Sequence, residues 1–267
     1  MGSSAVQLRK RLKGQHQGET MIDILSLDRA GILALLPADV DRLLTAEEFF
    51  HIAFQLDAYW SFDYNAADEG RTGEHARLKS ELHSDGFFVS RILLKSENML
   101  RIMAEQMAMK MVQAGFRLPT HVAGIPDGAT DLGKVVCEIL GAELIRLQKI
   151  DGKIVLVDEV PSGAIIAFPE DFCTRGTGFI ETVLAVRASP LCAPDVIIYP
   201  ANTVLLNRGG LKEVCVLGLG NFPVVAVVEK RINDWAPEAC PLCKMGSKPV
   251  KPKVDDATWE RFIHSQE

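Results

Sequence analysis

The residues best suited to chemistry are two adjacent acids, Glu170 and Asp171, which follow the apolar run 164–168. A continuous apolar run of this length predicts a buried strand. The loop 174–178 then opens a predicted helix, and backbone N–H groups at a helix N-terminus bind phosphate with the help of the helix dipole. Carboxylates repel phosphate, but they accept hydrogen bonds from sugar hydroxyls. The pattern therefore predicts a sugar-phosphate site, and a plain strand–turn–helix with an acidic cap is the alternative.

Three other segments carry residue types that suit anionic or aromatic ligands. Segment 78–88 has a lysine followed by an aromatic pair. Segment 124–129 reads Gly-Ile-Pro-Asp-Gly-Ala, a turn that presents backbone N–H groups to an anion. Segment 205–210 contains Arg208, and the planar guanidinium of arginine pairs well with a carboxylate. The structural alternatives are an aromatic pair in the core, an ordinary strand–helix connection and a solvated arginine.

In this order the four segments resemble those of type I phosphoribosyltransferases, and orotate phosphoribosyltransferase in particular. The resemblance covers about residues 75–235. It implies that Glu170 and Asp171 bind the ribose 2′ and 3′ hydroxyls. The 5′-phosphate is then expected at Thr174, Arg175, Gly176, Thr177 and Gly178, and the diphosphate at Pro126, Asp127, Gly128 and Ala129. The implied residues for the base are Phe87, Phe88 and Arg208.

The implied catalytic residues are lysines. Lys79 is expected to reach the anionic substrates, and Lys149 and Lys153 flank an Asp-Gly turn that resembles the mobile hood loop of the family. A solvated hairpin is the alternative for this turn, because the residues that follow it are apolar and acidic rather than basic. Three other departures from the family pattern are Asp127, Arg175 and Asn207.

The resemblance implies transfer of a phosphoribosyl group from 5-phosphoribosyl 1-diphosphate to orotate, with release of diphosphate. Mg²⁺ is the expected cofactor, bound mainly through the substrate diphosphate, and no covalent nucleophile is required. A homodimer is expected, in which the loop of one subunit covers the site of the other. Two alternatives stay open: transfer to another nucleobase, and a non-catalytic regulatory protein that binds the same ligand.

Composition excludes several other classes of protein. The 267 residues are 48% hydrophobic and carry a net charge of -6, which argues against a nucleic-acid partner. No apolar run approaches about 18 residues, so no membrane partner is expected. The polar and basic first twenty residues predict a disordered or tag-like leader, with Met21 as an alternative start. We expect a cytoplasmic protein.

The elements that must position these residues alternate between strand and helix from residue 120 onwards. This alternation predicts an α/β fold with a mostly parallel sheet and helices on both faces. The resemblance implies the type I phosphoribosyltransferase fold, with a small hood built from N-terminal and C-terminal segments. Residues 21–75 are expected to form a helical N-terminal extension or hood, residues 76–235 the phosphoribosyltransferase domain, and residues 236–267 a tail with a short helix at 255–264. Within the extension, Thr45 and Glu48 form a predicted capping box, and residues 60–76 read as loop.

The six cysteines do not form a secreted disulfide framework, because only Cys240 and Cys243 are closely spaced. One such pair supplies two ligands, whereas structural zinc usually needs four. His264 and the other cysteines are not spaced to complete the set, so no metal site is expected and half of a zinc site is the alternative.

Overall fold

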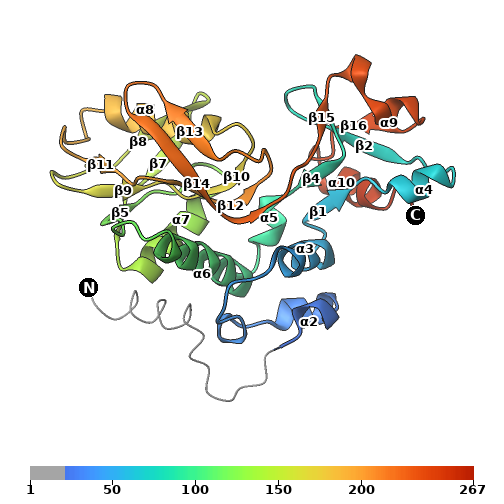
Figure 1. Cartoon of the computed structure of the whole chain (residues 1–267), viewed down its shortest axis with the longest axis horizontal. Coiled ribbons are helices and arrows are strands. Elements are labelled where there is room, and N and C mark those ends of the chain that lie inside the picture. Colours follow the sequence, from blue (N-terminus) through green and yellow to red (C-terminus); the bar gives the residue numbers. More distant parts are fainter. Residues whose placement is uncertain (1–21) are drawn as a thin grey trace.

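The structure is a computed structural model that describes residues 22–267, so the expected leader at 1–20 and Met21 lie outside the described residues. Two parts are visible in Figure 1. The larger is an α/β part that holds most of the strands. The smaller lies beside it and combines segments from both ends of the described chain. The predicted α/β class with a mostly parallel sheet is confirmed.

Parallel strands form the centre of the larger part. Four of them pair in the order β11-β9-β5-β6, all parallel. A second group pairs in the order β10-β12-β14-β13, and only β13 runs antiparallel. The bounds are β5 His121–Val122, β6 Glu143–Leu144, β9 Ile165–Ala167, β10 Glu170–Cys173, β11 Ile197–Ile198, β12 Asn202–Asn207, β13 Glu213–Val216 and β14 Gly220–Glu229.

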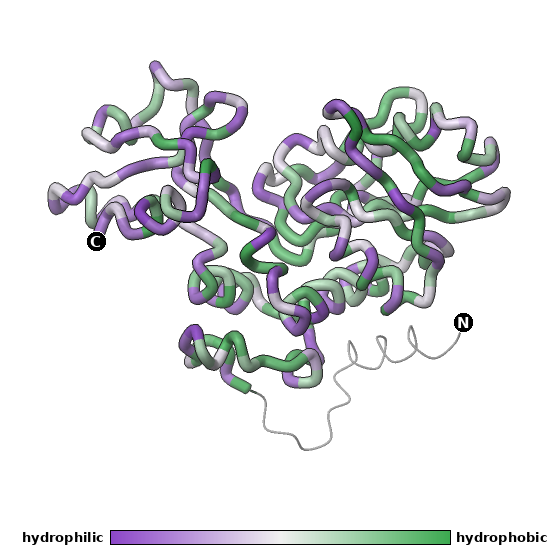
Figure 2. The backbone as a smooth tube through the Cα atoms, turned by 180° about the vertical axis from the view of Figure 1, so that it is seen from behind, coloured by the Kyte–Doolittle hydropathy of each residue, from purple (hydrophilic) through white to green (hydrophobic). Residues whose placement is uncertain are grey.

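Helices cover both faces of these strands. Ile165 and Ala167 of β9 pack in a core with α6 (Glu97–Gln113) and α7 (Thr130–Leu140). Ile166 and Phe168 point the other way, into a core with α8 (Thr177–Ala188). Side chains alternate between the faces of a strand, so a strand covered on both sides reads as continuously apolar. In Figure 2 much of the backbone in the larger part is green, the colour of hydrophobic residues.

The helix ends follow from local sequence signals. Ser96 caps α6 by accepting from the Met99 N–H, and Gly115 follows its end with a φ of 78°. Gly141 closes α7 in the left-handed conformation that glycine adopts without steric cost. Each of these helix ends thus carries a residue type that marks a helix boundary in the sequence.

The N-terminal segment 22–55 is mainly helical. It comprises the short elements η1 Ile24–Ser26, α2 Arg29–Ala34 and η2 Pro37–Asp39, followed by α3 Ala46–Gln55. Thr45 and Glu48 form the predicted capping box at the start of α3. The loop predicted at 60–76 is wrong, because this stretch contains parts of two short strands and a helix, namely β1 Tyr59–Ser61, α4 Tyr64–Asp68 and β2 Glu74–Arg77. Strands this short carry too few residues for alternation to be recognised.

The smaller part is built on a sheet with the order β15-β3-β2-β16, to which β3 (His83–Ser84), β15 (Asp234–Trp235) and β16 (Lys248–Val250) belong. Strand β1 pairs with β4 (Gly86–Phe88), which leads into α5 (Ser90–Leu93). The predicted C-terminal helix is confirmed as α10 (Asp256–Ile263), and α9 (Pro241–Lys244) follows η3 (Pro237–Ala239). This sheet takes strands from either side of the boundaries expected at 75 and 235, so those boundaries stay predictions.

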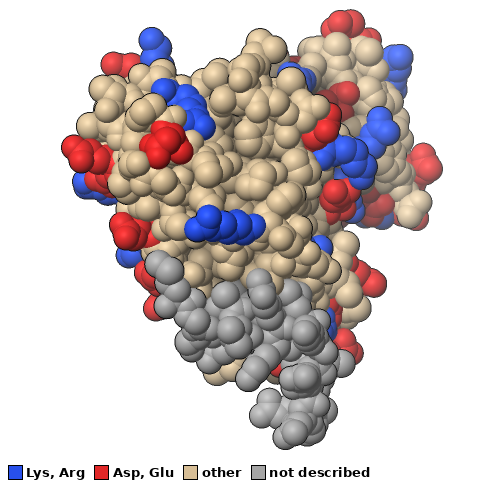
Figure 3. Space-filling model, turned by 60° about the vertical axis from the view of Figure 1, so that its left-hand side comes forward, with Lys and Arg blue, Asp and Glu red and all other residues tan. Residues whose placement is uncertain are grey.

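Charges on the face shown in Figure 3 are scattered among uncharged side chains and do not form one basic field. Among residues 22–267, no helix combines the length and the apolar character needed to cross a membrane.

Candidate active site

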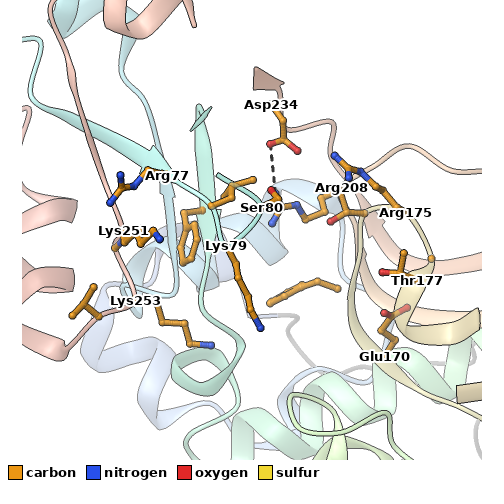
Figure 4. A pocket seen from close by; sticks show the side chains of 17 residues that line it. Arg77, Lys79, Ser80, Glu170, Arg175, Thr177, Arg208, Asp234, Lys251 and Lys253 are labelled. Atoms are coloured by element: carbon orange, nitrogen blue, oxygen red, sulfur yellow. Dashed lines mark ion pairs between the residues drawn. The ribbon is translucent and has the colours of Figure 1, made fainter. Parts of the chain in front are cut away.

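A cavity of about 650 Å³ lies between the two parts of the molecule. One wall comes from the larger part and carries Glu170, Thr177 and Arg208, and the opposite wall comes from the smaller part and carries lysine and arginine side chains (Figure 4). Many of the residues predicted for the site line this cavity: Lys79, Phe87, Glu170, Thr174, Arg175, Gly176, Thr177 and Arg208. The fold therefore brings together segments that lie about 130 residues apart.

Glu170 is the most perturbed acid of this wall. It begins β10, only 7% of its surface is exposed, and the Asn202 side-chain amide donates a hydrogen bond of 3.3 Å to its Oε2. Burial raises the pKa of Glu170 to about 8, with a further contribution from the negative charge of Asp171. A buried carboxyl group with a raised pKa is stabilised in its charged form by a ligand that supplies hydrogen-bond donors or positive charge.

The predicted phosphate loop forms the N-terminus of α8. Gly176 caps the helix with a φ of 70°, and a Cβ at this position would lie 2.6 Å from Val214. A Cβ on Gly178 would lie 2.7 Å from Glu170 Oε1, so the acid reaches back over the first turn of the helix. The free N–H groups of this turn and the acid therefore face the same small volume, as the sugar-phosphate interpretation requires.

The loop 124–129 lies against the acidic pair, although it does not line the cavity itself. A Cβ on Gly128 would lie 2.2 Å from Asp171 Oδ2, and the peptide bond between Pro126 and Asp127 is cis. Ala129, the last residue of the loop, caps α7. The predicted diphosphate segment and the predicted ribose segment are therefore neighbours, which their sequence order alone did not require.

Sequence reasoning missed most of the cationic wall. Besides Lys79, the smaller part contributes Arg77 from β2 and both Lys251 and Lys253 from the segment after β16 (Figure 4). Lys251 Nζ is 2.6 Å from Glu81 Oε1. Only the parallel pairing of β16 with β2 places 251–253 beside 77–79, and no local pattern in the C-terminal segment indicates it.

Arg208 follows β12 and lies at the edge of the cavity, where its guanidinium is 3.7 Å from Asp234. Burial lowers the pKa of Arg208, and the Asp234 charge opposes that shift. Within residues 22–267 its Nε is buried without a hydrogen-bond partner. An unpaired donor inside a site is costly, so a ligand acceptor here is favourable. Asp234 was not singled out in the sequence.

The two phenylalanines of β4 have different environments. Phe87 lines the cavity, with its ring centroid 5.9 Å from that of Trp259. Phe88 is 6% exposed and packs between Tyr59 and Phe172, with centroid distances of 5.6 and 4.7 Å. Of the pair, Phe87 can touch a ligand, whereas Phe88 supports Phe172, which itself lines the cavity.

Lys149 and Lys153 do not line this cavity. They lie on an exposed hairpin of β7 (Leu147–Ile150) and β8 (Lys153–Leu156), closed by the two residues Asp151 and Gly152. Both turn residues have positive φ, 50° and 78°, as a tight two-residue turn requires. The hairpin was the alternative to a hood loop, and within the described residues of one chain it does not line the cavity.

Relatives were found by sequence and by structure. The orotate phosphoribosyltransferase of Wolinella succinogenes is 28% identical over 191 residues, which cover 67% of this chain and 88% of the relative. That of Nitratiruptor sp. is 27% identical over 189 residues, covering 67% and 90%. No family model matches the chain.

Among solved structures, orotate phosphoribosyltransferase from Aeropyrum pernix aligns with a TM-score of 0.45 and 16% identity, over 61% of this chain and 93% of that chain. Both sequence relatives bear the name of the family that the sequence motifs resemble. Over two thirds of its length, the chain is similar in sequence to orotate phosphoribosyltransferases.

Proposed function

We propose that this chain is a phosphoribosyltransferase of pyrimidine biosynthesis, which transfers the phosphoribosyl group of 5-phosphoribosyl 1-diphosphate to orotate. The observation that carries the proposal is the cavity in which Glu170 and the α8 N-terminus face a wall of lysine and arginine side chains. One side offers acceptors for hydroxyls and N–H donors for a phosphate. The other offers the positive charge that a diphosphate needs.

In the proposed reaction a ring nitrogen of orotate forms a bond to the anomeric carbon as the bond from that carbon to diphosphate breaks, and the proton of that nitrogen passes to the departing diphosphate. The ribose is held by Glu170 and Asp171, and its 5′-phosphate by the loop 174–178. Negative charge develops on the leaving diphosphate, and Lys79 with its cationic neighbours stabilises it. The orotate carboxylate pairs with Arg208, where it competes with Asp234.

Mg²⁺ is proposed as the cofactor, held mainly by the diphosphate. Oxygen ligands suit it, and the carboxylates of Asp127 and Asp171 lie in or against the proposed diphosphate loop. These acids would otherwise repel the diphosphate, so the residues present fit a cation that neutralises it.

A regulatory, non-catalytic role is the second candidate, and the short β7–β8 hairpin favours it. A turn of two residues gives Lys149 and Lys153 no reach over the cavity of their own subunit. For catalysis we propose a homodimer in which the hairpin of the partner completes the site. Transfer to a different base is a further alternative. It is supported by the ion pair between Arg208 and Asp234, because Arg208 already has an acidic partner in place of a substrate carboxylate.

The binding test uses isothermal titration calorimetry with 5-phosphoribosyl 1-diphosphate and Mg²⁺. The double variant Glu170→Ala, Asp171→Ala should lose measurable binding, while Glu213→Ala, an exposed acid of β13, should bind as the wild type does. Equal affinity of the double variant and the wild type would refute the site.

A further inference from the structure

Four potential metal ligands meet in the smaller part, away from the cavity. They are His75 of β2, His83 of β3, Cys240 just before α9 and Cys243 within it, and their ligand atoms all lie within 4.8 Å of one another. His75, His83 and Cys240 are 0%, 4% and 1% exposed. The proposed function uses none of these residues.

The distances between the ligand atoms match a tetrahedral site. For a metal about 2.0–2.1 Å from nitrogen and about 2.3 Å from sulfur, the tetrahedral edges are about 3.3 Å between two nitrogens and about 3.6 Å between nitrogen and sulfur. His75 Nε2 lies 3.1 Å from His83 Nδ1 and 3.6 Å from both sulfurs. Cys243 Sγ lies 3.3 Å from His83 Nδ1. Four edges of one tetrahedron are thus close to their expected lengths.

The surroundings of His75 orient it as a ligand. Its Nδ1 lies 2.9 Å from Ser247 Oγ, and the Ser247 hydroxyl donates to the Gly73 carbonyl at 3.3 Å. Because the hydroxyl proton is used in this way, Ser247 Oγ accepts from His75 Nδ1–H. The lone pair of His75 is then on Nε2, which points at the two sulfurs. Metal-binding histidines are commonly fixed by such a hydrogen bond on the other ring nitrogen.

We propose that His75, His83, Cys240 and Cys243 bind a structural Zn²⁺ ion. A set of two sulfurs and two nitrogens in tetrahedral arrangement selects zinc among the common divalent metals. All four positions are filled by protein groups, so no coordination position is left for water or substrate, and the site is structural rather than catalytic.

The site would connect the parts of the smaller domain that carry the cationic wall. Arg77 lies two residues after His75 on β2, and β16, which pairs with β2, leads directly to Lys251. The hydrophobic core of this part is small, with nine buried residues in its cluster. A small core of this kind gains stability from a metal that binds only the folded state.

The sequence alone indicated at most half of the site. The Cys-x-x-Cys pair supplies two ligands, and the two histidines lie more than 150 residues earlier in the chain. The pairing of β2 with β3 brings the two histidines together. Cys240 and Cys243, at the start of α9, lie beside them. No metal site was expected because neither His264 nor the other cysteines are spaced to supply the two missing ligands. His75 and His83 supply them instead, and His264 lies outside the cluster.

The test measures metal content of the untagged full-length chain, expressed with zinc, by inductively coupled plasma mass spectrometry. We expect one zinc ion per chain. Cys243→Ser and His83→Gln should lose it, whereas the matched controls Cys215→Ser and His264→Gln, at exposed positions elsewhere, should keep it. Zinc retained equally in all four variants, or absent from the wild type, would overturn the proposal.

A second measurement does not depend on the folding of the variants. Co²⁺ exchanged into the wild-type chain should give thiolate-to-cobalt charge transfer and the strong visible bands of a tetrahedral ion. X-ray absorption of the zinc form should give two sulfur and two nitrogen neighbours. An octahedral cobalt spectrum, or a chain mass two hydrogens lower from a disulfide between Cys240 and Cys243, would contradict it. Neither readout involves transferase activity, so this result is independent of the proposed function.

Discussion

Replacing Glu170 by glutamine should change how stability depends on pH. The folded protein raises the pKa of Glu170 from its ordinary value of 4.5 to about 8, chiefly because the side chain is buried. Between these pH values the folded state keeps a proton that the unfolded state has lost. The free energy of unfolding therefore falls as pH rises from about 4.5 to about 8, and the stability that the protonated group retains at low pH is lost there.

The size of the effect follows from the same two values. At about 1.4 kcal/mol for each pH unit, the loss is at most about 5 kcal/mol, and water entering the cavity reduces it. Glu170→Gln removes the titration while keeping an acceptor and the shape of the side chain. Relative to the wild type, the variant should become steadily more stable between about pH 4.5 and about pH 8, and the difference should then level off.

Urea unfolding at several pH values measures this difference directly. Glu181→Gln, an exposed position on α8, is the matched control and should run parallel to the wild type. A constant difference between Glu170→Gln and the wild type across this range would show that the acid titrates alike in both states. The burial argument would then be refuted.

Three further changes test other parts of the site. Phe88→Ala should lower the free energy of unfolding by about 3–5 kcal/mol, because it leaves a cavity in a buried aromatic cluster. An unchanged urea midpoint would exclude that packing role. Lys253→Ala should weaken 5-phosphoribosyl 1-diphosphate binding about two- to fivefold in calorimetry, whereas the control Lys244→Ala on α9 should not. Equal effects of the two substitutions would contradict a role of the cationic wall in binding. Gly128→Ala should weaken the same ligand about tenfold or more, because the new methyl meets Asp171, and wild-type affinity would remove this loop from the site.

Helix caps and the main ligand loop were predictable because their physical causes are local. Ser96 marks the start of α6 through a hydrogen bond to a residue three positions later. Gly141 marks the end of α7 through its own backbone conformation. The strand 165–167 was recognisable because both of its faces are buried, which makes it apolar throughout. The loop 174–178 follows from the same strand–turn–helix pattern.

The other site residues could not be predicted, because their positions depend on strand pairings between distant parts of the chain. Lys251 and Lys253 reach the cavity only because β16 adds to β2, a contact across about 170 residues. Phe87 and Phe88 look alike in sequence, yet the alternation of β4 sends one to the cavity and the other into the core. His75 and His83 carry no signal of their own until the smaller sheet aligns them.

Diphosphate release from 5-phosphoribosyl 1-diphosphate and Mg²⁺, followed with orotate and with a panel of other bases, tests the central claim most directly. We expect release that depends on orotate and is abolished in Arg208→Gln, with 5-phosphoribosyl 1-diphosphate still bound. Release with another base alone would contradict the role of Arg208 in choosing the substrate. Tight binding of the ligand without release for any base would contradict the transferase and favour the regulatory role.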